Sequence, residues 1–393
     1  MSRLEELIRQ LCPDGVEYKK IGAIAEVGTG SSNGNEASDD GQYPFFIRSQ
    51  TIRLKNDYEY DDEAIIIPGE GGIGEIFHYI NGKYALHQRV YRIHFLVNDV
   101  LTKFAYYYMQ AYFKPFILKK AVSATVTSIR KPMIEDFPIP IPPIEAQQEI
   151  VRILDQFTEL TAELTAELTA RKKQYEYYRD NLLTFEEPTI WVELGTVIKS
   201  LNTGLNPRRF FKLNTDDATN YYVTIREIQN NTIVFSAKTD RINDSALRLC
   251  NNRSNLEVGD VLFSGTGTIG ETALIVEPPM DWNIKEGVYA IKPTQDKIIP
   301  RFLMYLLQTS KIKTAILKKA AGGTVKSVPM GELQKIKIPV PQLHTQERII
   351  DLLDRFDTLC NDLTSGLPAE IEARQKQYEY YRDKLLTFKK KTT

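Results

Sequence analysis

The chain has 393 residues, of which 42% are apolar and 26% charged, values ordinary for a globular protein of two or three domains. No apolar run approaches the length of about 18 residues that a membrane-spanning helix needs, and the charged N-terminus excludes a secretory signal, so we expect a cytoplasmic protein without a membrane partner. A net charge of −1 argues against a strongly basic nucleic-acid-binding domain, and three widely separated cysteines argue for a reducing compartment and against a cysteine-built metal site.

The first half of the chain mixes predicted helices and strands. Residues 1–11 predict a short amphipathic helix. The β-branched runs broken by glycine in AIIIPGEGGIGEIF at 64–77 indicate strands and tight turns, and KFAYYYMQAYFKPFILKKA at 103–121 predicts a helix. The proline-rich segment at 139–148 ends this globular part. One unbroken helix of about 60 Å is then predicted from about residue 145 to residue 185.

The second half repeats the first. RKKQYEYYRDNLLTF at 171–185 returns as RQKQYEYYRDKLLTF at 374–388, with 13 of 15 positions identical. GEGGIGE at 69–75 corresponds to GTGTIGE at 265–271. We therefore predict a tandem of two similar units, each a globular part followed by a long helix.

The predicted fold class is α+β: two tandem mixed α/β domains, each followed by a long helix, with the two helices packing as an antiparallel coiled coil. The second helix contains Gly366 and Pro368, so we expect a kink near 364–369. The predicted segments are a first domain at 1–143, a first long helix at 144–187, a second domain at 188–342 and a second helical region at 343–390.

The helices carry an apolar stripe that needs a partner, because apolar residues recur at three, four or seven positions. The second copy of the helix can supply that partner. We predict that the helix–helix or subunit interface consists of Leu154, Phe157, Leu160, Leu164, Leu168, Tyr175, Tyr178, Leu182, Leu353, Phe356, Tyr378, Tyr381 and Leu385.

Residues that would carry catalysis are not found in the sequence. The two GxGxxG motifs are followed by β-like sequence, which favours a strand-turn-strand over a dinucleotide site. The four histidines lack metal-ligand spacing, and the phosphate-loop pattern GxxxxGK[ST] is absent. We expect a non-catalytic binding or assembly module without a metal or cofactor of its own.

Basic and polar residues near turns and helix ends are the better functional signal. Lysine and arginine neutralise phosphates, and arginine and glutamine can read base edges. For each residue alone, a solvated surface charge is the alternative, and the recurring lysine pair could also mark a face that binds a partner. The candidate DNA-binding residues are Arg48, Gln50, Arg53, Lys119, Lys120, Thr125, Thr127, Arg130, Arg208, Arg209, Lys212, Arg226, Lys318, Lys319, Thr324 and Lys326.

Two variable globular parts, the repeated QKQYEYYRDKLLTF-type helices and LTAELTAEL at 160–168 together resemble the specificity subunits of type I restriction-modification systems, in the subclass with TAEL repeats. DGVEYKKIG at 14–22 and WVELG at 191–195 resemble the starts of that family's target recognition domains. By contrast, residues 28–60 and 200–250 share almost nothing beyond an alignment of Phe46-Ile47-Arg48 with Thr224-Ile225-Arg226, as two different reading surfaces would.

The resemblance implies a non-catalytic reader of double-stranded DNA, with one recognition domain for each half of an asymmetric, bipartite target. It implies two modification subunits that methylate adenine with S-adenosylmethionine, and two restriction subunits that use ATP and Mg²⁺. The alternative is a two-domain coiled-coil scaffold that binds proteins and no DNA.

Overall fold

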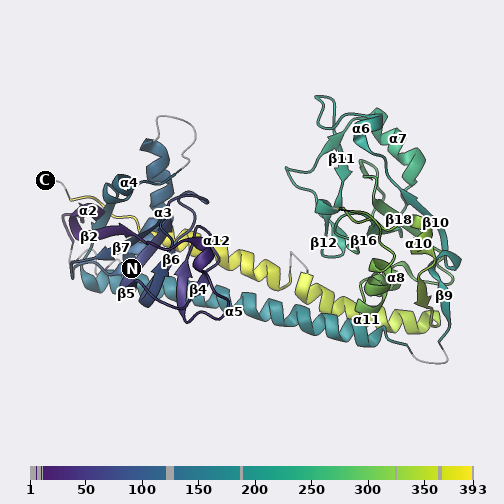
Figure 1. Ribbon diagram of the computed structural model, residues 1–393. Coiled ribbons are helices and arrows are strands. Elements are labelled where there is room, and N and C mark those ends of the chain that lie inside the picture. The colour runs from purple at the N-terminus through teal and green to yellow at the C-terminus, as the bar shows by residue number, and fades with distance from the viewer. Residues whose placement is uncertain are drawn as a thin grey trace. The chain divides into compact units, whose positions relative to one another are not determined.

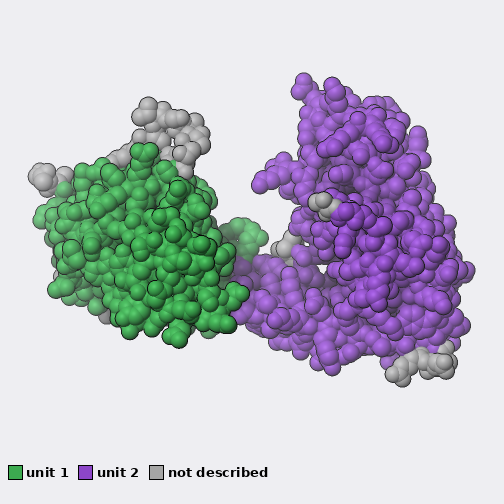
Figure 2. Space-filling model, in the orientation of Figure 1, with its two compact units in different colours: residues 1–163, 372–393 green, residues 164–371 purple. Residues whose placement is uncertain are grey.

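The computed structural model describes residues 6, 10, 12–120, 128–185, 189–323, 325–361 and 365–391. The chain divides into two compact units (Figure 2): unit 1 comprises residues 1–163 and 372–393, and unit 2 comprises residues 164–371. The helix predicted at 1–11 lies outside the described residues except at positions 6 and 10. No helix in the described part of the chain combines the length and the apolar character needed to cross a membrane.

Unit 1 is organised around a six-stranded sheet with strand order β2-β7-β5-β6-β3-β4 (Figure 1). All pairings in it are antiparallel except that of β3 with β6. Helix α3 packs over β5, and the short strands β1 and β8 pair beside the sheet. Its elements are β1 (Glu17–Lys20), α2 (Ile21–Ile24), β2 (Ala25–Thr29), η1 (Gly34–Glu36), β3 (Tyr43–Phe46), β4 (Arg53–Lys55), β5 (Tyr60–Pro68), β6 (His78–Leu86), β7 (Val90–Phe95), α3 (Thr102–Lys120), α4 (Lys131–Glu135) and β8 (Pro138–Ile141).

Unit 2 is organised around two larger sheets, with strand orders β10-β18-β15-β16 and β14-β11-β17. Its elements are β9 (Trp191–Glu193), η2 (Leu194–Thr196), β10 (Ile198–Thr203), α6 (Pro207–Phe210), β11 (Asn220–Val223), η3 (Ile225–Glu227), β12 (Ile228–Gln229), β13 (Thr232–Ile233), β14 (Arg241–Ile242), α7 (Asp244–Ser254), β15 (Val261–Ser264), β16 (Thr272–Leu274), β17 (Trp282–Ile284), β18 (Val288–Pro293), α8 (Pro300–Leu307), α9 (Ser310–Leu317), α10 (Met330–Gln334) and β19 (Lys337–Pro339).

The two units share one strand plan. β10, β18 and β15 pair as β2, β7 and β5 do, and β11 pairs in parallel with β17 as β3 pairs with β6. The difference is that the long strand β6 of unit 1 corresponds to two strands, β16 and β17, separated by the segment 275–281. The common plan extends into residues 28–60 and 200–250, where the sequences had shown almost no similarity.

Three long helices complete the units: α5 (Ile144–Leu182), α11 (Leu343–Asn361) and α12 (Leu367–Leu385). In unit 1 the early part of α5 packs beside the late part of α12, where the rings of Phe157 and Tyr381 stack at 5.4 Å. In unit 2 the late part of α5 packs beside α11, where Tyr178 and Phe356 stack at 5.5 Å. This pairing of early with late segments is that of antiparallel helices, so the predicted fold class is confirmed. The described helices end at 361 and begin again at 367, on either side of part of the expected kink region.

The predicted interface residues divide between the two units instead of forming one separate seam. Leu154, Tyr378 and Leu385 pack into the core of unit 1 together with residues of its sheet and α3. Leu168, Tyr175, Leu182, Leu353 and Phe356 pack into the core of unit 2. Leu160 and Leu164 are only partly buried. The helices therefore contact both each other and the globular parts.

In each unit, a fully buried glutamine links a long helix to the globular part by hydrogen bonds. Gln147 accepts a hydrogen bond from the Leu101 N–H at 2.8 Å and donates to the carbonyl oxygens of Asp99 and Pro142, both at 2.7 Å. Gln346 makes the same three bonds in unit 2, with the Ile299 N–H and the carbonyl oxygens of Lys297 and Pro341. An amide is suited to this position because it offers a donor and an acceptor together.

We expect Gln147→Ala to lower the free energy of unfolding of unit 1 by about 1–3 kcal/mol, because the Leu101 N–H and two carbonyl oxygens would lose a buried partner. Gln346→Ala should do the same to unit 2. Urea unfolding followed by tryptophan and tyrosine fluorescence measures both. The exposed neighbour Gln148 supplies the control, since Gln148→Ala should change stability by less than about 0.5 kcal/mol. An equal loss of unfolding free energy in Gln147→Ala and Gln148→Ala would contradict the stabilising role of the Gln147 hydrogen bonds.

Candidate nucleic-acid interface

Both GxGxxG motifs lie in loops between antiparallel strands, as predicted. The first joins β5 to β6 and the second joins β15 to β16. Gly74 and Gly270, the last glycines of the two motifs, have φ of 65° and 100°, a region that favours glycine. Lys114 lies against Gly74 and Lys313 lies against Gly270. Each loop therefore has a lysine at the same place beside it.

In unit 1, three chain segments meet at the first glycine of the motif. The Gly69 N–H donates to the Arg89 carbonyl oxygen at 2.9 Å, and the Ile129 N–H donates to the Gly69 carbonyl oxygen at 2.7 Å. The predicted residue Arg130 comes directly after Ile129 and is exposed. Backbone hydrogen bonds thus place the loop, the β6–β7 connection and the start of α4 in one junction.

Unit 2 repeats this junction. The Gly265 N–H donates to the Gly287 carbonyl oxygen at 2.8 Å, and the Val328 N–H donates to the Gly265 carbonyl oxygen at 2.9 Å. The Gly267 N–H donates to the carbonyl oxygen of the predicted residue Lys326 at 2.9 Å. The same three segments therefore meet in both units, although their side chains differ.

Two arginines converge on one carboxylate in the unit 1 junction. The Arg48 guanidinium contacts Glu70 at 3.0 Å, and the Arg89 guanidinium contacts both Glu70 oxygens at 2.8 Å. Arg89 and Arg48 lower the pKa of the Glu70 carboxyl. The pKa of the neighbouring His87 is lowered, first by burial and then by these two arginines, which keeps the imidazole neutral at pH 7. The group carries two positive charges and one negative charge.

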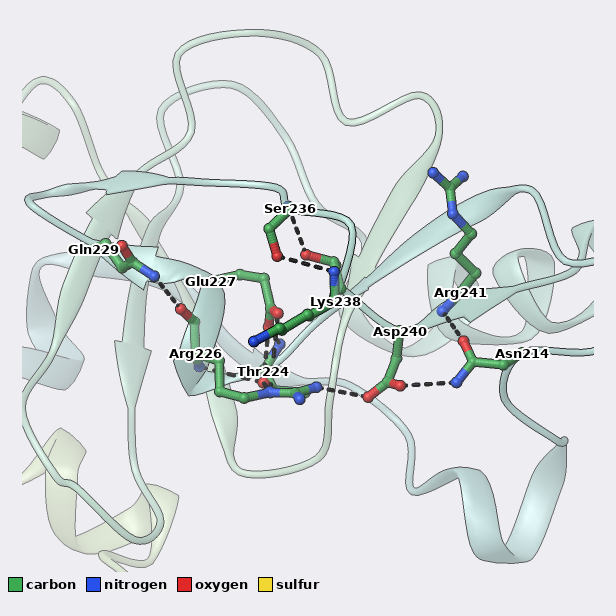
Figure 3. A network of polar contacts seen from close by, with 10 residues as sticks. Asn214, Thr224, Arg226, Glu227, Gln229, Ser236, Lys238, Asp240 and Arg241 are labelled. Carbon is green, nitrogen blue, oxygen red and sulfur yellow. Dashed lines mark hydrogen bonds and ion pairs between the residues drawn. The ribbon is translucent and has the colours of Figure 1, made fainter. Parts of the chain in front are cut away.

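In unit 2, Arg226 lies in a denser polar network (Figure 3). Arg226 donates to Asp240 at 2.6 Å, and Asn214 donates to the other oxygen of Asp240 at 2.9 Å. Beneath Arg226, the buried Glu227 accepts from the N–H and the hydroxyl of Thr224, which forms the capping box of η3. The backbone that carries Arg226 is therefore fixed on both sides of the residue.

Arg48 and Arg226 occupy corresponding places in the shared strand plan. The His87 N–H donates to the Phe46 carbonyl oxygen at 3.0 Å at the end of β3, and the Lys285 N–H donates to the Val223 carbonyl oxygen at 2.8 Å at the end of β11. Arg48 comes two residues after Phe46 and Arg226 three residues after Val223. Each arginine thus lies just after the strand that pairs in parallel with its neighbour.

The other candidate DNA-binding residues are scattered over the surfaces of the two units. Lys319 contacts Glu332 at 3.0 Å, and α6 carries Arg208 and Arg209. Thr125, Thr127 and Thr324 lie outside the described residues, as does the side chain of Lys120. The remaining predicted residues, all exposed, are Gln50, Arg53, Lys119, Arg130, Lys212, Lys318 and Lys326.

Sequence reasoning missed Arg89, Lys114, Lys313 and the carboxylates that hold the arginines. Lys114 and Lys313 could have been found, because they recur three residues before the repeated ILKKA segments. The residue types of Arg89, Glu70 and Asp240 are not repeated in the other half of the chain, so their role is visible only in the folded structure. Across the described ranges, no group of three or more histidine, cysteine, aspartate or glutamate side chains could hold a metal ion.

Comparison with known proteins identifies the family to which the chain belongs. The model of the type I restriction modification DNA specificity domain matches residues 13–171 and 191–373. A relative from Haemophilus influenzae, named as a putative type I restriction enzyme specificity subunit, is 30% identical over 95% of this chain and 96% of its own length. The specificity subunit of an Escherichia coli type I restriction enzyme is 34% identical over 75% of this chain and 73% of its own length.

Solved structures agree on the fold. The crystal structure of a type I restriction-modification S subunit from M. genitalium matches with a TM-score of 0.55 at 16% identity, over 95% of this chain and 96% of that one. The sequence matches cover both globular parts and most of the helices between them. The chain therefore belongs to the family of type I restriction-modification specificity subunits.

Proposed function

We propose that this specificity subunit reads an asymmetric, bipartite target in double-stranded DNA, with one half-site for each unit. The observation that carries the proposal is the pairing of one shared strand plan with two different polar surfaces, Arg48–Glu70–Arg89 in unit 1 and Arg226–Asp240–Asn214 in unit 2. Reading two unlike sequences requires unlike polar groups, and a common scaffold can carry them. The scaffold alternative is less well supported, because the matching family is described by DNA specificity.

The chain itself is proposed to be non-catalytic. It would direct adenine methylation by two modification subunits and cleavage by two restriction subunits, which would bind S-adenosylmethionine, ATP and Mg²⁺. Exposed tyrosines on the repeated helices, Tyr177 and Tyr380, offer amphipathic surface for such subunits. The reacting groups would belong to those partners, so this chain's part is to place them on the chosen sequence.

Exchange of a recognition domain tests the modular reading. Replacing residues 1–143 with the equivalent part of a relative should change one half-site of the methylated target and leave the other half unchanged. Mapping methylated adenines across a host genome measures both halves at once. Alteration of both halves would show that the two units do not read independently, and binding without any sequence preference would favour the scaffold alternative.

Lysines that neutralise phosphates should carry affinity without specificity. Lys319 contacts Glu332 in an exposed pair, which is worth little and can be exchanged for a phosphate contact. We expect Lys318→Ala with Lys319→Ala to weaken binding to all sequences, and to reduce the slope of log K against log salt by about 0.9 for each phosphate that is no longer neutralised. Titrations of the complex on specific and random duplexes at several salt concentrations measure this.

Lys376→Ala is the matched control, because Lys376 forms a similarly exposed pair with Glu372 on α12. It should leave the slope unchanged. If the double lysine variant also kept the slope of the unmodified chain, Lys318 and Lys319 would be ordinary solvated charges.

The TAEL tract offers a test of how the target is spaced. It lies at 160–168 in α5, and the division between the two units falls inside it, after Glu163. Inserting one more TAEL after Leu168 would lengthen α5 by about 6 Å and rotate the C-terminal part of the helix by about 400°, a net turn of about 40°. One base pair of DNA advances about 3.4 Å and turns about 34–36°.

We expect this insertion to lengthen the unread spacer of the target by one base pair, because a recognition domain turned to the wrong face of the duplex cannot reach its groove. The added length fits two base pairs better, but tilt or DNA bending can absorb a few ångströms. Both half-sites should keep their sequences. Mapping of methylated adenines measures the spacer and both half-sites. An unchanged spacer or altered half-site bases would show that the length of α5 does not set the spacing of the target.

A further inference from the structure

Each unit presents an arginine just after the strand that pairs in parallel with its neighbour, and a different carboxylate holds each one. Arg48 is held by Glu70, which comes from the glycine loop. Arg226 is held by Asp240, which comes from the segment before β14. The two carboxylates are not counterparts in the repeat, so the same arrangement is reached in two ways. An arginine held by a carboxylate thus occurs in both units, although the carboxylate comes from a different segment in each. This repetition indicates that the orientation of the arginine is functionally important.

The carboxylates leave most of each guanidinium free. Arg48 uses only Nη1 for Glu70, and its side chain is 46% exposed. Arg226 uses Nη2 for Asp240 and Nε for the Thr224 hydroxyl, and its side chain is 56% exposed. A guanidinium has five N–H donors, so at least two remain on each arginine for a ligand. In each case they can form a planar pair.

A planar pair of donors matches the O6 and N7 acceptors that guanine presents in the major groove. We propose that Arg48 and Arg226 each read a guanine in one half-site, and that Glu70 and Asp240 are positioning residues that fix the plane of the guanidinium. This inference rests on the proposed reading of DNA by the two units. It adds the residue in each unit that selects a base and the base that it selects.

The positioning role follows from the flexibility of arginine. A free arginine loses side-chain entropy when one geometry is imposed on it. A carboxylate that already holds one edge reduces that loss upon binding. Thr224 and Glu227 extend the effect in unit 2, since they hold the backbone of η3 under Arg226. In unit 1, Arg89 neutralises Glu70, so the group keeps one net positive charge toward DNA.

The test uses the full complex with modification subunits on a library of duplexes with randomised half-sites, followed by sequencing of the methylated products. Arg48→Ala should reduce the preference for guanine at one position of the first half-site by about 5- to 150-fold, the range expected for removal of one bidentate pair. Arg226→Ala should do the same at one position of the second half-site. Every other position should keep its preference.

Arg48→Lys and Arg226→Lys separate base reading from phosphate binding. Lysine retains the charge and loses the planar fork, so the guanine preference should fall while the salt dependence of binding stays unchanged. Arg152→Ala is the matched control, because the exposed Arg152 also contacts a carboxylate, that of Glu149 on α5. It should leave both half-sites unchanged.

Glu70→Gln and Asp240→Asn test the positioning role. Each removes a negative charge, so binding to all DNA should become tighter while the preference for guanine falls. A carboxylate that merely stabilised the fold would instead weaken binding on removal. Asp240→Glu should restore part of the guanine preference.

Three outcomes would overturn the inference. The first is a half-site of the unmodified complex that contains no preferred G·C pair. The second is an equal loss of affinity for all sequences in Arg48→Ala or Arg226→Ala, which would make that arginine a phosphate contact. The third is an unchanged guanine preference in these variants. A complex that methylates the library without any preference would overturn the proposed function itself.

Discussion

The structure depends on burying the end of each repeated helix in the core of the other repeat's globular part. Leu386, from the second copy, is 1% exposed and belongs to the same buried core of unit 1 as Phe104 and Met109. Leu183, from the first copy, is 4% exposed and belongs to the same buried core of unit 2 as residues of α8. A buried leucine of this kind contributes about 1.5–3 kcal/mol. Neither globular part is complete without the other's helix, and this explains why the helix motif is the best preserved part of the repeat.

Because each repeated helix packs into the globular part of the other repeat, the surface residues outside these cores can differ between the units. Packing constrains the strands, the glutamines Gln147 and Gln346 and the stacked rings, because a change there opens a cavity or leaves a buried polar group without a partner. The junctions around Gly69 and Gly265 are held by backbone hydrogen bonds and by close packing, since a Cβ at Gly265 would clash with the Tyr289 ring, but the residue after each glycine differs between the units. Side chains such as Glu70 and its counterpart Thr266 can therefore differ without cost to the fold. This is the physical basis for two different polar surfaces on one scaffold.

The internal repeat and the helical periodicity could be recognised in the sequence, but most of the tertiary arrangement could not. The long helices and the glycine turns were predicted correctly, because spacing and composition determine them locally. The common strand plan under residues 28–60 and 200–250 could not be predicted, since β pairing joins distant residues and tolerates almost any exposed side chain. Arg48 could be named as a candidate from its residue type alone. Glu70, which orients it, and Arg89, which shares Glu70, could not, because they meet only through tertiary contacts. The sequence aligned Arg48 with Arg226, whereas the parallel strand pairs place Arg226 one residue further past its strand than Arg48.

The near-neutral net charge had argued against DNA binding. The pairing of arginines with carboxylates explains how a chain of low net charge can still bind bases. A protein that holds DNA only by its phosphates gains from unpaired cations and becomes basic. A reader of bases needs cations with a fixed direction, and a carboxylate beside each one supplies direction at the cost of net charge. Arg48 with Glu70 and Arg226 with Asp240 are of this kind, so a net charge of −1 is compatible with base reading. In the proposed complex, the nonspecific attraction to phosphate would then come largely from the partner subunits, and this chain would supply selectivity.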